Sequence, residues 1–326
     1  MAPAHAQQAP AGATYASRPD AMAYAQTIAE GHLLPLDWVN AMVGQARFLP
    51  RVPPLMVPST QAAARNWAGY RSRFVEPIRI GAARAFVNRH AATLARAERD
   101  FGVPPAIVAG IIGVETIYGR YTGNISVLDA LCTLSFDFPE AHPRAAARSQ
   151  YFRGELGTFL ALAYRARRPP QDYQGSYAGA MGLPQFMPSS WEKYAIDYDG
   201  DGSIDLFASV PDAVGSVANY FVAHGWTPGM PTHFPVSLDD ARLQLATLLE
   251  PDILPTFSVA QMQALGVQLP PQAQGHAGPL ALIELPNGSA PPSYVAGTEN
   301  FYAITRYNWS SFYAMAVIEL GRAALG

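Results

Sequence analysis

One segment limits what this chain can fold into more than any other: an apolar stretch, GVPPAIVAGIIGVETIYGR, with one acid near its end. Pro105 suits the first turn of a helix, where no backbone donor is needed, and Gly119 suits the exit. Helical steps of three and four residues place Ile111 and Ile112 on the face that carries Glu115. The pattern predicts a buried helix with Glu115 in its last turn, facing the core.

The predicted position of Glu115 is unfavourable for a charged carboxyl group. Burial raises the pKa of a carboxyl, and the negative end of the helix dipole raises it further. Both effects favour a protonated Glu115 near neutral pH, which is the state that a general acid requires. Two simpler arrangements stay open from the residues alone: Glu115 pairs with an arginine such as Arg120, or it projects into water.

Length and composition describe a globular, loop-rich and mainly helical protein. The 326 residues fit one large domain or two to three smaller ones. Apolar residues make up 49%, charged residues 14%, and the net charge is −3. Such a chain has no strong field of one sign, which argues against nucleic acid as a partner. The 29 prolines and 27 glycines indicate many loops and short helices.

The N-terminal segment and the lengths of the apolar stretches indicate where in the cell the protein is expected. Residues 1–13, MAPAHAQQAPAGA, look like the small-residue tail of a processed secretion signal, so we expect a disordered segment and an exported protein. The longest apolar run, 103–114, is shorter than the roughly 18 residues that span a bilayer. We expect a soluble chain without a transmembrane segment, while a lipid anchor on a precursor stays open. The single cysteine, Cys132, is expected to be a buried small hydrophobe.

The residue pattern divides the rest of the chain into three domains. Residues 14–95 carry apolar residues at helical spacing and predict a helical N-terminal domain. The densest chemistry lies in 96–226, which we combine with 299–326 as the core domain. Residues 227–298 alternate or run short between Pro, Gly and Asn, as expected of a small β-containing module. The predicted fold class is therefore mainly α, with a smaller β part.

Some helices can be placed individually. The runs 65–74 and 80–99 predict two helices, with turn and N-cap residues in the stretch MVPST before the first. Ser310 and Ser311 can cap a C-terminal helix over 312–325. Its buried stripe would contain Phe312, Met315 and Ile318.

A glycine-rich loop, GSYAGAMGLPQFMPSSWEKY, is a candidate binding feature. Gly179 and Gly182 permit backbone angles that other residues avoid and let a ligand approach the main chain. Residues 189–192 fit the capping box S-x-x-E, so a helix is expected to begin there. The other groups are neutral hydrogen-bonding side chains and apolar wall: Ser176, Gln185, Met181, Phe186 and Met187. They suit an uncharged sugar, and an ordinary interhelical loop fits the stretch equally well.

An acidic loop matches most of a calcium-binding EF-hand. Positions 1, 3, 5, 6, 7 and 9 of that motif are filled by Asp197, Asp199, Asp201, Gly202, Ser203 and Asp205. Position 12 should be a bidentate acid and is Ala208, which weakens the predicted site. A structural calcium ion and a hydrogen-bonded turn without metal are both compatible with the loop.

Taken in order, the motifs resemble a known family, the lytic murein transglycosylases of the membrane-bound B type, whose core is similar to goose-type lysozyme. The resemblance runs from about residue 67 to 325. Its most specific stretches are GIIGVET, DALCTLSF, GAMGLPQFMPSSW, DGDGSIDL, DAVGSVANYFVAHGW and NFYAITRYNWSSFYAMAV.

The resemblance implies a lysozyme-like helical core with Glu115 as the catalytic acid and base. It also implies a glycan groove lined by Tyr70, Arg148, Ser176, Gln185, Tyr220, Tyr307, Asn308 and Tyr313. The sequence departs from the family in three places. The segment before Tyr151 is longer, with only Arg148 where relatives carry two adjacent arginines; the metal loop ends in Ala208; and the lipid-anchor cysteine of some members is missing.

The family reaction cleaves the β-1,4 bond between N-acetylmuramic acid and N-acetylglucosamine. The muramoyl 6-hydroxyl attacks the anomeric carbon, so the product carries a 1,6-anhydro end and no cofactor is needed for the chemistry. The resemblance implies peptidoglycan glycan strands as substrate, a periplasmic location, and other cell-wall enzymes as candidate partners. We expect a monomer.

Three rival functions stay open. A hydrolytic muramidase of the same fold would need a second carboxylate, for which Asp129 and Asp137 are candidates. A non-catalytic peptidoglycan-binding protein would lose no cell-wall lysis on Glu115→Gln. A calcium-binding regulator would need a large response to calcium, which Ala208 disfavours.

Overall fold

The computed structural model describes residues 12–58 and 65–326. The segment 1–13, predicted to be disordered, therefore lies outside the described residues except for its last two. Of these, Gly12 donates to the carbonyl of Phe48, and the carbonyl of Ala13 accepts from the amide of Phe48 at 2.9 Å.

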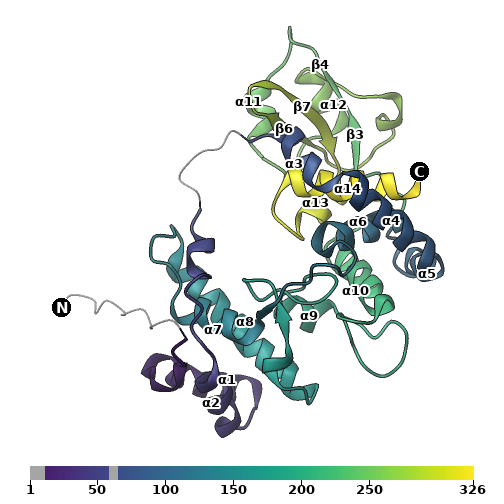
Figure 1. The fold of residues 1–326 in the computed structure, drawn as a ribbon. Coiled ribbons are helices and arrows are strands. Elements are labelled where there is room, and N and C mark those ends of the chain that lie inside the picture. The colour runs from purple at the N-terminus through teal and green to yellow at the C-terminus, as the bar shows by residue number, and fades with distance from the viewer. Residues whose placement is uncertain (1–11, 59–64) are drawn as a thin grey trace. The chain divides into compact units, whose positions relative to one another are not determined.

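The chain forms two compact units, each made of several separate segments. Unit 1 comprises 1–61, 119–195 and 205–210, and unit 2 comprises 62–118, 196–204 and 211–326. The predicted boundaries at 95/96, 226/227 and 298/299 all fall inside unit 2. Both units are mainly helical (Figure 1).

Unit 1 is a group of helices around one apolar core. Its helices are α1 (Pro19–His32), α2 (Leu36–Gln45), α7 (Val127–Phe136), α8 (Ala145–Arg165) and α9 (Pro188–Tyr194). Short 3-10 turns are η1 (Tyr15–Ser17), η2 (Pro53–Met56) and η3 (Pro170–Asp172), and β1 (Ile125–Ser126) pairs antiparallel with β2 (Gln174–Gly175). The core includes Cys132, which is fully buried as predicted. Cys132 packs as a small apolar side chain on α7, whose other buried residues are mostly apolar.

Unit 2 contains the predicted acid-bearing helix and the C-terminal helix, packed against each other. Its helices are α3 (Trp67–Phe74), α4 (Pro77–Arg89), α5 (Ala91–Phe101), α6 (Pro105–Thr116), α10 (Val210–Ala223), α13 (Glu299–Thr305) and α14 (Ser311–Leu325). Helices α6 and α14 meet backbone to backbone. A Cβ on Gly110 would lie 2.3 Å from the carbonyl oxygen of Val317, and one on Gly321 would lie 1.9 Å from that of Ala106. Only glycine permits this approach.

A small β-containing part of unit 2 has its own core. Strands β3 (His233–Pro235), β7 (Ala290–Gly297) and β6 (Ala281–Asn287) form an antiparallel sheet in that order, and β4 (Ser237–Leu238) pairs with β5 (Val267–Gln268). Between β4 and β5 the chain forms helices α11 (Leu245–Leu249) and α12 (Val259–Ala264), and between β5 and β6 it forms the 3-10 turn η4 (Pro271–Ala273). Residues from Phe234 to Ala296 supply the buried cluster. The predicted stretches HFPVSL and PLALIEL contribute β3, β4 and β6.

The structure corrects two helix predictions and confirms a third. The predicted helix 80–99 is interrupted at His90, which separates α4 from α5. The N-cap of α3 is Asn66, whose side chain accepts from the amide of Gly69, and not a residue of MVPST. The C-terminal helix is confirmed, since Ser310 caps α14 by accepting from the amide of Tyr313.

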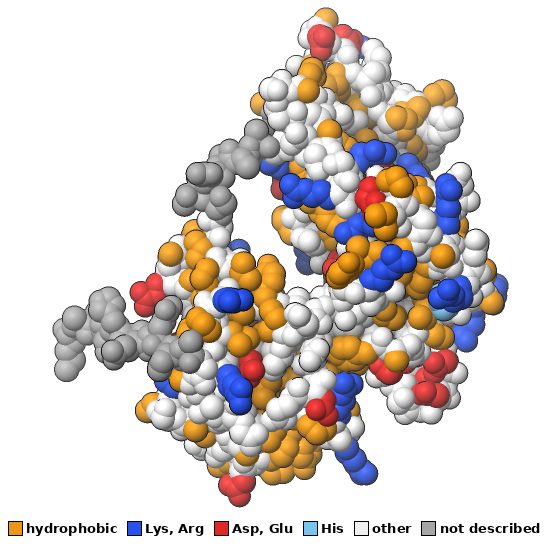
Figure 2. Space-filling view, viewed as in Figure 1, with side chains coloured by type: hydrophobic (Ala, Val, Ile, Leu, Met, Phe, Trp, Pro, Cys, Tyr) orange, Lys and Arg blue, Asp and Glu red, His pale blue; other side chains and the backbone are white. Residues whose placement is uncertain are grey.

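Surface charge is dispersed on the visible face of the molecule. Figure 2 shows basic side chains singly or in small groups among apolar and polar surface. Across the described residues, no helix combines the length and the apolarity that crossing a membrane requires.

Candidate active site

Helix α6 ends one residue after Glu115 in a strained turn. The prediction that Gly119 forms its exit is wrong: the helix stops at Thr116, and Ile117 and Tyr118 adopt left-handed angles with φ of 50° and 58°. Left-handed backbone costs about 1–2 kcal/mol for a residue with a side chain. It is held here because the amides of Ile117 and Tyr118 donate to the last carbonyls of α6. Glu115 therefore lies at a fixed helix end.

The carboxyl group of Glu115 is surrounded by protein and keeps only limited solvent access. The hydroxyl of Tyr313, on α14, donates to its Oε1 at 2.5 Å. Burial raises the pKa of Glu115 to about 7, and the hydrogen bond from Tyr313 lowers it against that trend. Near neutral pH the carboxyl thus exchanges a proton readily, as a group that acts first as an acid and then as a base must do.

Aromatic rings surround this carboxyl within unit 2. The rings of Tyr307 and Tyr313 are stacked with centroids 6.3 Å apart, and Tyr220 lies 4.8 Å from Tyr307. Burial raises the pKa of Tyr307 and of Tyr313 well above the ordinary value, and the negative charge of Glu115 adds to both shifts. Burial, and then the charge of Glu115, also raises the pKa of Tyr70. These phenols stay neutral and can only donate or accept hydrogen bonds.

Unit 2 therefore brings together five predicted site residues: Glu115, Tyr70, Tyr220, Tyr307 and Tyr313. The hydroxyl of Tyr220 donates to the carbonyl of Arg306 at 2.7 Å, which ties α10 to the end of α13. Asn308 follows in the exposed turn before α14, where its carbonyl accepts from the amide of Ser310 at 2.6 Å.

The other predicted binding residues belong to unit 1. The hydroxyl of Ser176 accepts from the backbone amides of Ala178 and Ala180. The side-chain Nε2 of Gln185 donates to the carbonyls of Thr122 and Gly182. These bonds order the glycine-rich loop. Met181 is only 1% exposed and belongs to the unit 1 core.

Arg148, on α8, projects over two aromatic side chains. Its guanidinium carbon lies 4.9 Å from the ring centre of Tyr151 and 5.0 Å from that of Phe152. Cation–π contacts of this kind hold an arginine in one orientation.

The predicted capping box at Ser189 is wrong. Helix α9 begins at Pro188, and Ser189 makes no bond to Glu192; its amide and hydroxyl donate instead to the two carboxylate oxygens of Glu155, at 2.8 and 2.6 Å. Glu155 is buried on α8 and caps α9 from outside it. No local signal in the sequence marks Glu155 as this capping group, because it lies 34 positions from Ser189.

The acidic loop is closed by its own backbone. Oδ1 and Oδ2 of Asp197 accept from the amides of Gly200, Asp201 and Gly202, and these bonds, led by that from Gly202, lower the pKa of Asp197. One carboxylate oxygen from each of Asp197, Asp199 and Asp201 lies within 4.8 Å of the others. Three convergent carboxylates are a donor set that Ca²⁺ accepts.

Two further acids near this loop have different roles. Asp205, which was predicted to fill position 9 of the EF-hand loop, is not in that group; its Oδ1 accepts from the amides of Phe207 and Ala208. Asp212, which sequence analysis missed, is buried in the first turn of α10, and its Oδ1 accepts from the amide of Tyr198 at 2.7 Å. Its carboxylate anchors the loop to α10.

Both acids nominated for a hydrolytic mechanism are engaged in unit 1. Asp137 is 6% exposed, accepts from the hydroxyl of Tyr15 at 2.7 Å and forms an ion pair with Arg18 at 3.0 Å. Asp129 accepts from the amide of Arg47 at 2.8 Å. These contacts assign both carboxylates a structural task.

Comparison with known proteins identifies the family of the chain. The family model described as the transglycosylase SLT domain matches residues 17–322. The membrane-bound lytic murein transglycosylase B of Escherichia coli strain K12 is 39% identical over 324 residues, which cover 96% of this chain and 84% of that protein.

Solved structures match over nearly the whole chain. The E. coli lytic transglycosylase Slt35, in complex with bulgecin A and in complex with calcium, gives a TM-score of 0.83 at 39% identity, covering 97% of this chain and 95% of that one. The soluble lytic transglycosylase SltB1 of Pseudomonas aeruginosa gives 0.83 at 37% identity, covering 94% and 98%.

The fold and these matches define an enzyme with a mainly helical, lysozyme-like architecture, as the sequence predicted. The chain belongs to the lytic transglycosylase family that carries the SLT domain.

Proposed function

We propose that this enzyme cleaves the β-1,4 bond between N-acetylmuramic acid and N-acetylglucosamine in peptidoglycan and leaves a 1,6-anhydromuramoyl end. The observation that carries the proposal is the single carboxyl of Glu115, whose pKa is raised to about 7 at the end of α6. The reactions of its relatives supply the substrate class.

Glu115 performs both proton transfers in this reaction. Protonated, it donates to the glycosidic oxygen as the bond to the muramoyl anomeric carbon breaks. The resulting carboxylate then takes the proton of the muramoyl 6-hydroxyl as that oxygen bonds to the same carbon. The proton is returned to Glu115, and no water is consumed. Because nucleophile and electrophile belong to one sugar, no separate water has to be positioned.

Tyr313 helps a single carboxyl group, that of Glu115, to act as both acid and base. Its hydroxyl stabilises the carboxylate that forms after the first transfer, while burial stabilises the neutral acid before it. The substrate's acetamido group would stabilise the positive anomeric centre in place of a second acid. Tyr70, Tyr220 and Tyr307 supply aromatic surface for sugar rings, and Arg148, Ser176, Gln185 and Asn308 are proposed to contact the strand.

The acidic loop is proposed to hold a structural Ca²⁺. The carboxylate oxygens would come from Asp197, Asp199 and Asp201. The backbone carbonyl of Ser203 would supply a further oxygen ligand. The calcium complex of E. coli Slt35 supports this assignment. The ion would stiffen the loop and take no part in the chemistry.

We also retain the predicted organisation and setting as proposals. The separate core around β3, β6 and β7 supports a module over 227–298. The other proposed domains are 14–95 and 96–226 plus 299–326. The substrate class supports a periplasmic enzyme. We propose that it acts on glycan strands as a monomer, with other cell-wall enzymes as partners.

Mass spectrometry of digested sacculi tests the reaction. The proposed enzyme releases muropeptides one water lighter than hydrolysis products, and Glu115→Gln releases them at least about a hundredfold more slowly. Products with ordinary reducing ends would instead identify a hydrolytic muramidase. Undiminished lysis by Glu115→Gln would identify a protein that does not use this carboxyl.

A further inference from the structure

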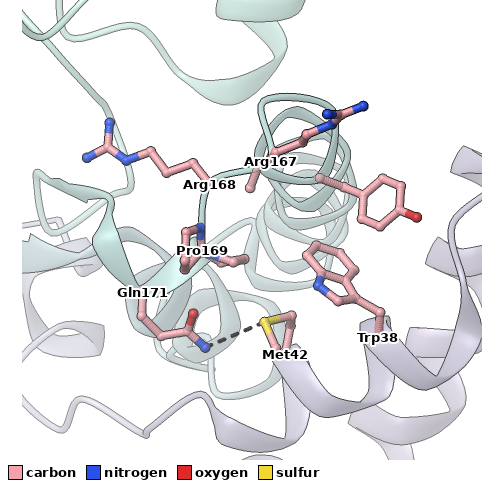
Figure 3. A pocket seen from close by; sticks show the side chains of 9 residues that line it. Trp38, Met42, Arg167, Arg168, Pro169 and Gln171 are labelled. Atoms are coloured by element: carbon pink, nitrogen blue, oxygen red, sulfur yellow. Dashed lines mark hydrogen bonds between the residues drawn. The ribbon is translucent and has the colours of Figure 1, made fainter.

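A pocket of unit 1 shares no residue with the Glu115 site. It lies between α2 and the end of α8 and has a volume of about 590 Å³, within the range of ligand pockets. Figure 3 shows Trp38 and Met42 on one side and Pro169 and Gln171 on the other. The pocket thus has an apolar wall with polar groups at its edge.

Two aromatic rings that contact each other form part of this wall. Trp38, on α2, and Tyr164, on α8, pack edge to face with centroids 5.0 Å apart and an angle of 66°. Tyr164 is nevertheless 41% exposed. An ordered aromatic surface that stays in water suits a ligand with an apolar face, such as the C–H face of a pyranose ring.

A free cation stands at the rim. Arg167 follows α8 in left-handed conformation, with φ of 52°, and its amide donates to the carbonyl of Tyr164. Glycine is the residue that fits this helix exit without strain. Among the residues that the structure describes, the guanidinium of Arg167 has no ion-pair or hydrogen-bond partner, whereas that of the nearby Arg165 pairs with Glu192. An exposed arginine at a position that favours glycine, with its charge unpaired, is available to a ligand.

The neighbouring polar groups are already committed. Arg168 donates to the carbonyl of Asp172 at 2.9 Å and lies 4.4 Å from the ring centre of Tyr173. The amide nitrogen of Gln171 donates to Oε1 of Gln45 at 3.1 Å, which leaves its oxygen to accept from a ligand. The pocket therefore offers one bidentate cation, one amide acceptor and an aromatic wall.

We propose that this pocket is a second peptidoglycan-binding site, which packs a sugar ring against Trp38 and Tyr164 and pairs Arg167 with a carboxylate of the peptide stem. The ligand class rests on the proposed function. One free guanidinium matches one carboxylate by charge and by its planar fork. Arg165 and Arg168 lie close to Arg167 in the chain, but Arg165 pairs with Glu192 and Arg168 lies over the ring of Tyr173. An anionic membrane is recognised by several basic residues whose charges are available together, whereas this rim makes one available. A second contact on the same polymer raises the local concentration of strand near the enzyme.

Retention on purified sacculi tests the site, with Glu115→Gln in every variant so that the sacculi stay intact. The double variant Tyr164→Ala/Arg167→Gly is expected to lose at least about tenfold in affinity. Glycine relieves the left-handed strain, so Arg167→Gly alone should keep or raise Tm while it weakens retention. Tyr164→Phe keeps the ring and should retain binding. Arg99→Ala, which removes an exposed cation of α5, is the matched control and should bind like the parent.

Turnover of short, soluble glycan fragments by the same variants with native Glu115 separates this site from catalysis. It is expected to stay unchanged. Unchanged retention of the double variant overturns the proposal, and so does an equal loss of retention and fragment turnover. Loss of binding only to phosphatidylglycerol vesicles would assign the pocket to a membrane. Failure of the proposed function is visible separately, as missing anhydro products from the wild type.

Discussion

The hydroxyl of Tyr313 donates a 2.5 Å hydrogen bond to Oε1 of Glu115, although the two residues are 198 positions apart. The bond stabilises the carboxylate, whereas burial stabilises the neutral acid, and the pKa of about 7 results from this opposition. The glycine contacts between α6 and α14 bring the two groups within reach.

Replacing Tyr313 by Phe removes the effect that lowers the pKa of Glu115. The pKa should therefore rise, and the alkaline limb of the kcat/KM–pH profile should move to higher pH. The rate at its optimum should fall, because the carboxylate formed after the first proton transfer loses a donor. A profile of kcat/KM from pH 5 to 9 checks both effects. An alkaline limb at its original pH would show that this bond does not set the pKa.

Glu115→Gln should lower activity by a factor of about 10² to 10⁴ and stabilise the fold above neutral pH. The folded-state pKa of about 7 exceeds the ordinary value of 4.5, so the native protein binds the proton more tightly than the unfolded chain. Wild-type stability should therefore fall relative to the variant as pH rises from 4.5 to 7, by about 1–3 kcal/mol. Urea unfolding at pH 4.5 and 8 measures this difference. The exposed Glu98→Gln in α5 should show none.

Asp137→Asn should destabilise the fold by about 1–3 kcal/mol, because Arg18 loses its buried charged partner and keeps its ion pair with the more exposed Asp20. Tyr15→Phe, which removes a neutral donor to the same carboxylate, should cost about 1 kcal/mol. Activity per folded molecule, measured well below Tm, should not change in either variant. A large loss of kcat in folded Asp137→Asn would revive the hydrolytic mechanism with Asp137 as its second acid.

The sequence determined the acid-bearing helix because its signals are local. Pro105 and the apolar residues spaced up to Glu115 lie within one helix. As predicted, α6 begins at Pro105 and carries Glu115 in its last turn. The exit could not be predicted, because Ile117 and Tyr118 take left-handed angles that single residues disfavour. Tyr118 is held by packing: its hydroxyl lies 2.3 Å from where a Cβ on Gly113 would stand.

The capping of α9 shows the same limit. Ser189 has the local pattern of a capping box, and the buried carboxylate of Glu155 outcompetes it through a tertiary contact. The aromatic surroundings of Glu115 were named by the family resemblance, since nothing in the spacing of Tyr70, Tyr220 and Tyr307 relates them to one another. Local chemistry thus predicts elements, and tertiary contacts decide their ends.

Calcium should raise Tm if the acidic loop binds it. Because Ala208 supplies no bidentate acid, half-saturation is expected at about 10⁻⁴ to 10⁻³ M. A concentration of 100 Kd would contribute about 2.7 kcal/mol of stability. Asp201→Asn should remove the shift, and Asp240→Asn, an exposed acid outside the loop, should keep it. An equal calcium response in both variants would place the ion elsewhere, and no response in the wild type would leave the loop as a hydrogen-bonded turn.

Two glycine-to-alanine exchanges in helices of unit 2 should have opposite effects. In α4, a Cβ on Gly81 would meet nothing within 4 Å, so Gly81→Ala should stabilise the protein by about 0.5–1 kcal/mol through lower chain entropy and better helix propensity. In α14, the Cβ of Gly321→Ala would lie 1.9 Å from the carbonyl oxygen of Ala106, so the backbones of α14 and α6 must separate. Overpacking of this kind costs about 1–3 kcal/mol.

The separation caused by Gly321→Ala also predicts a functional effect. Helix α6 carries Glu115 and α14 carries Tyr313, so a wider spacing should lengthen their hydrogen bond and raise the pKa of Glu115. The alkaline limb of kcat/KM should then shift in the same direction as in Tyr313→Phe, while Gly81→Ala keeps the wild-type profile. A destabilised Gly321→Ala with an unshifted profile would show that the contact between the two helices serves stability alone.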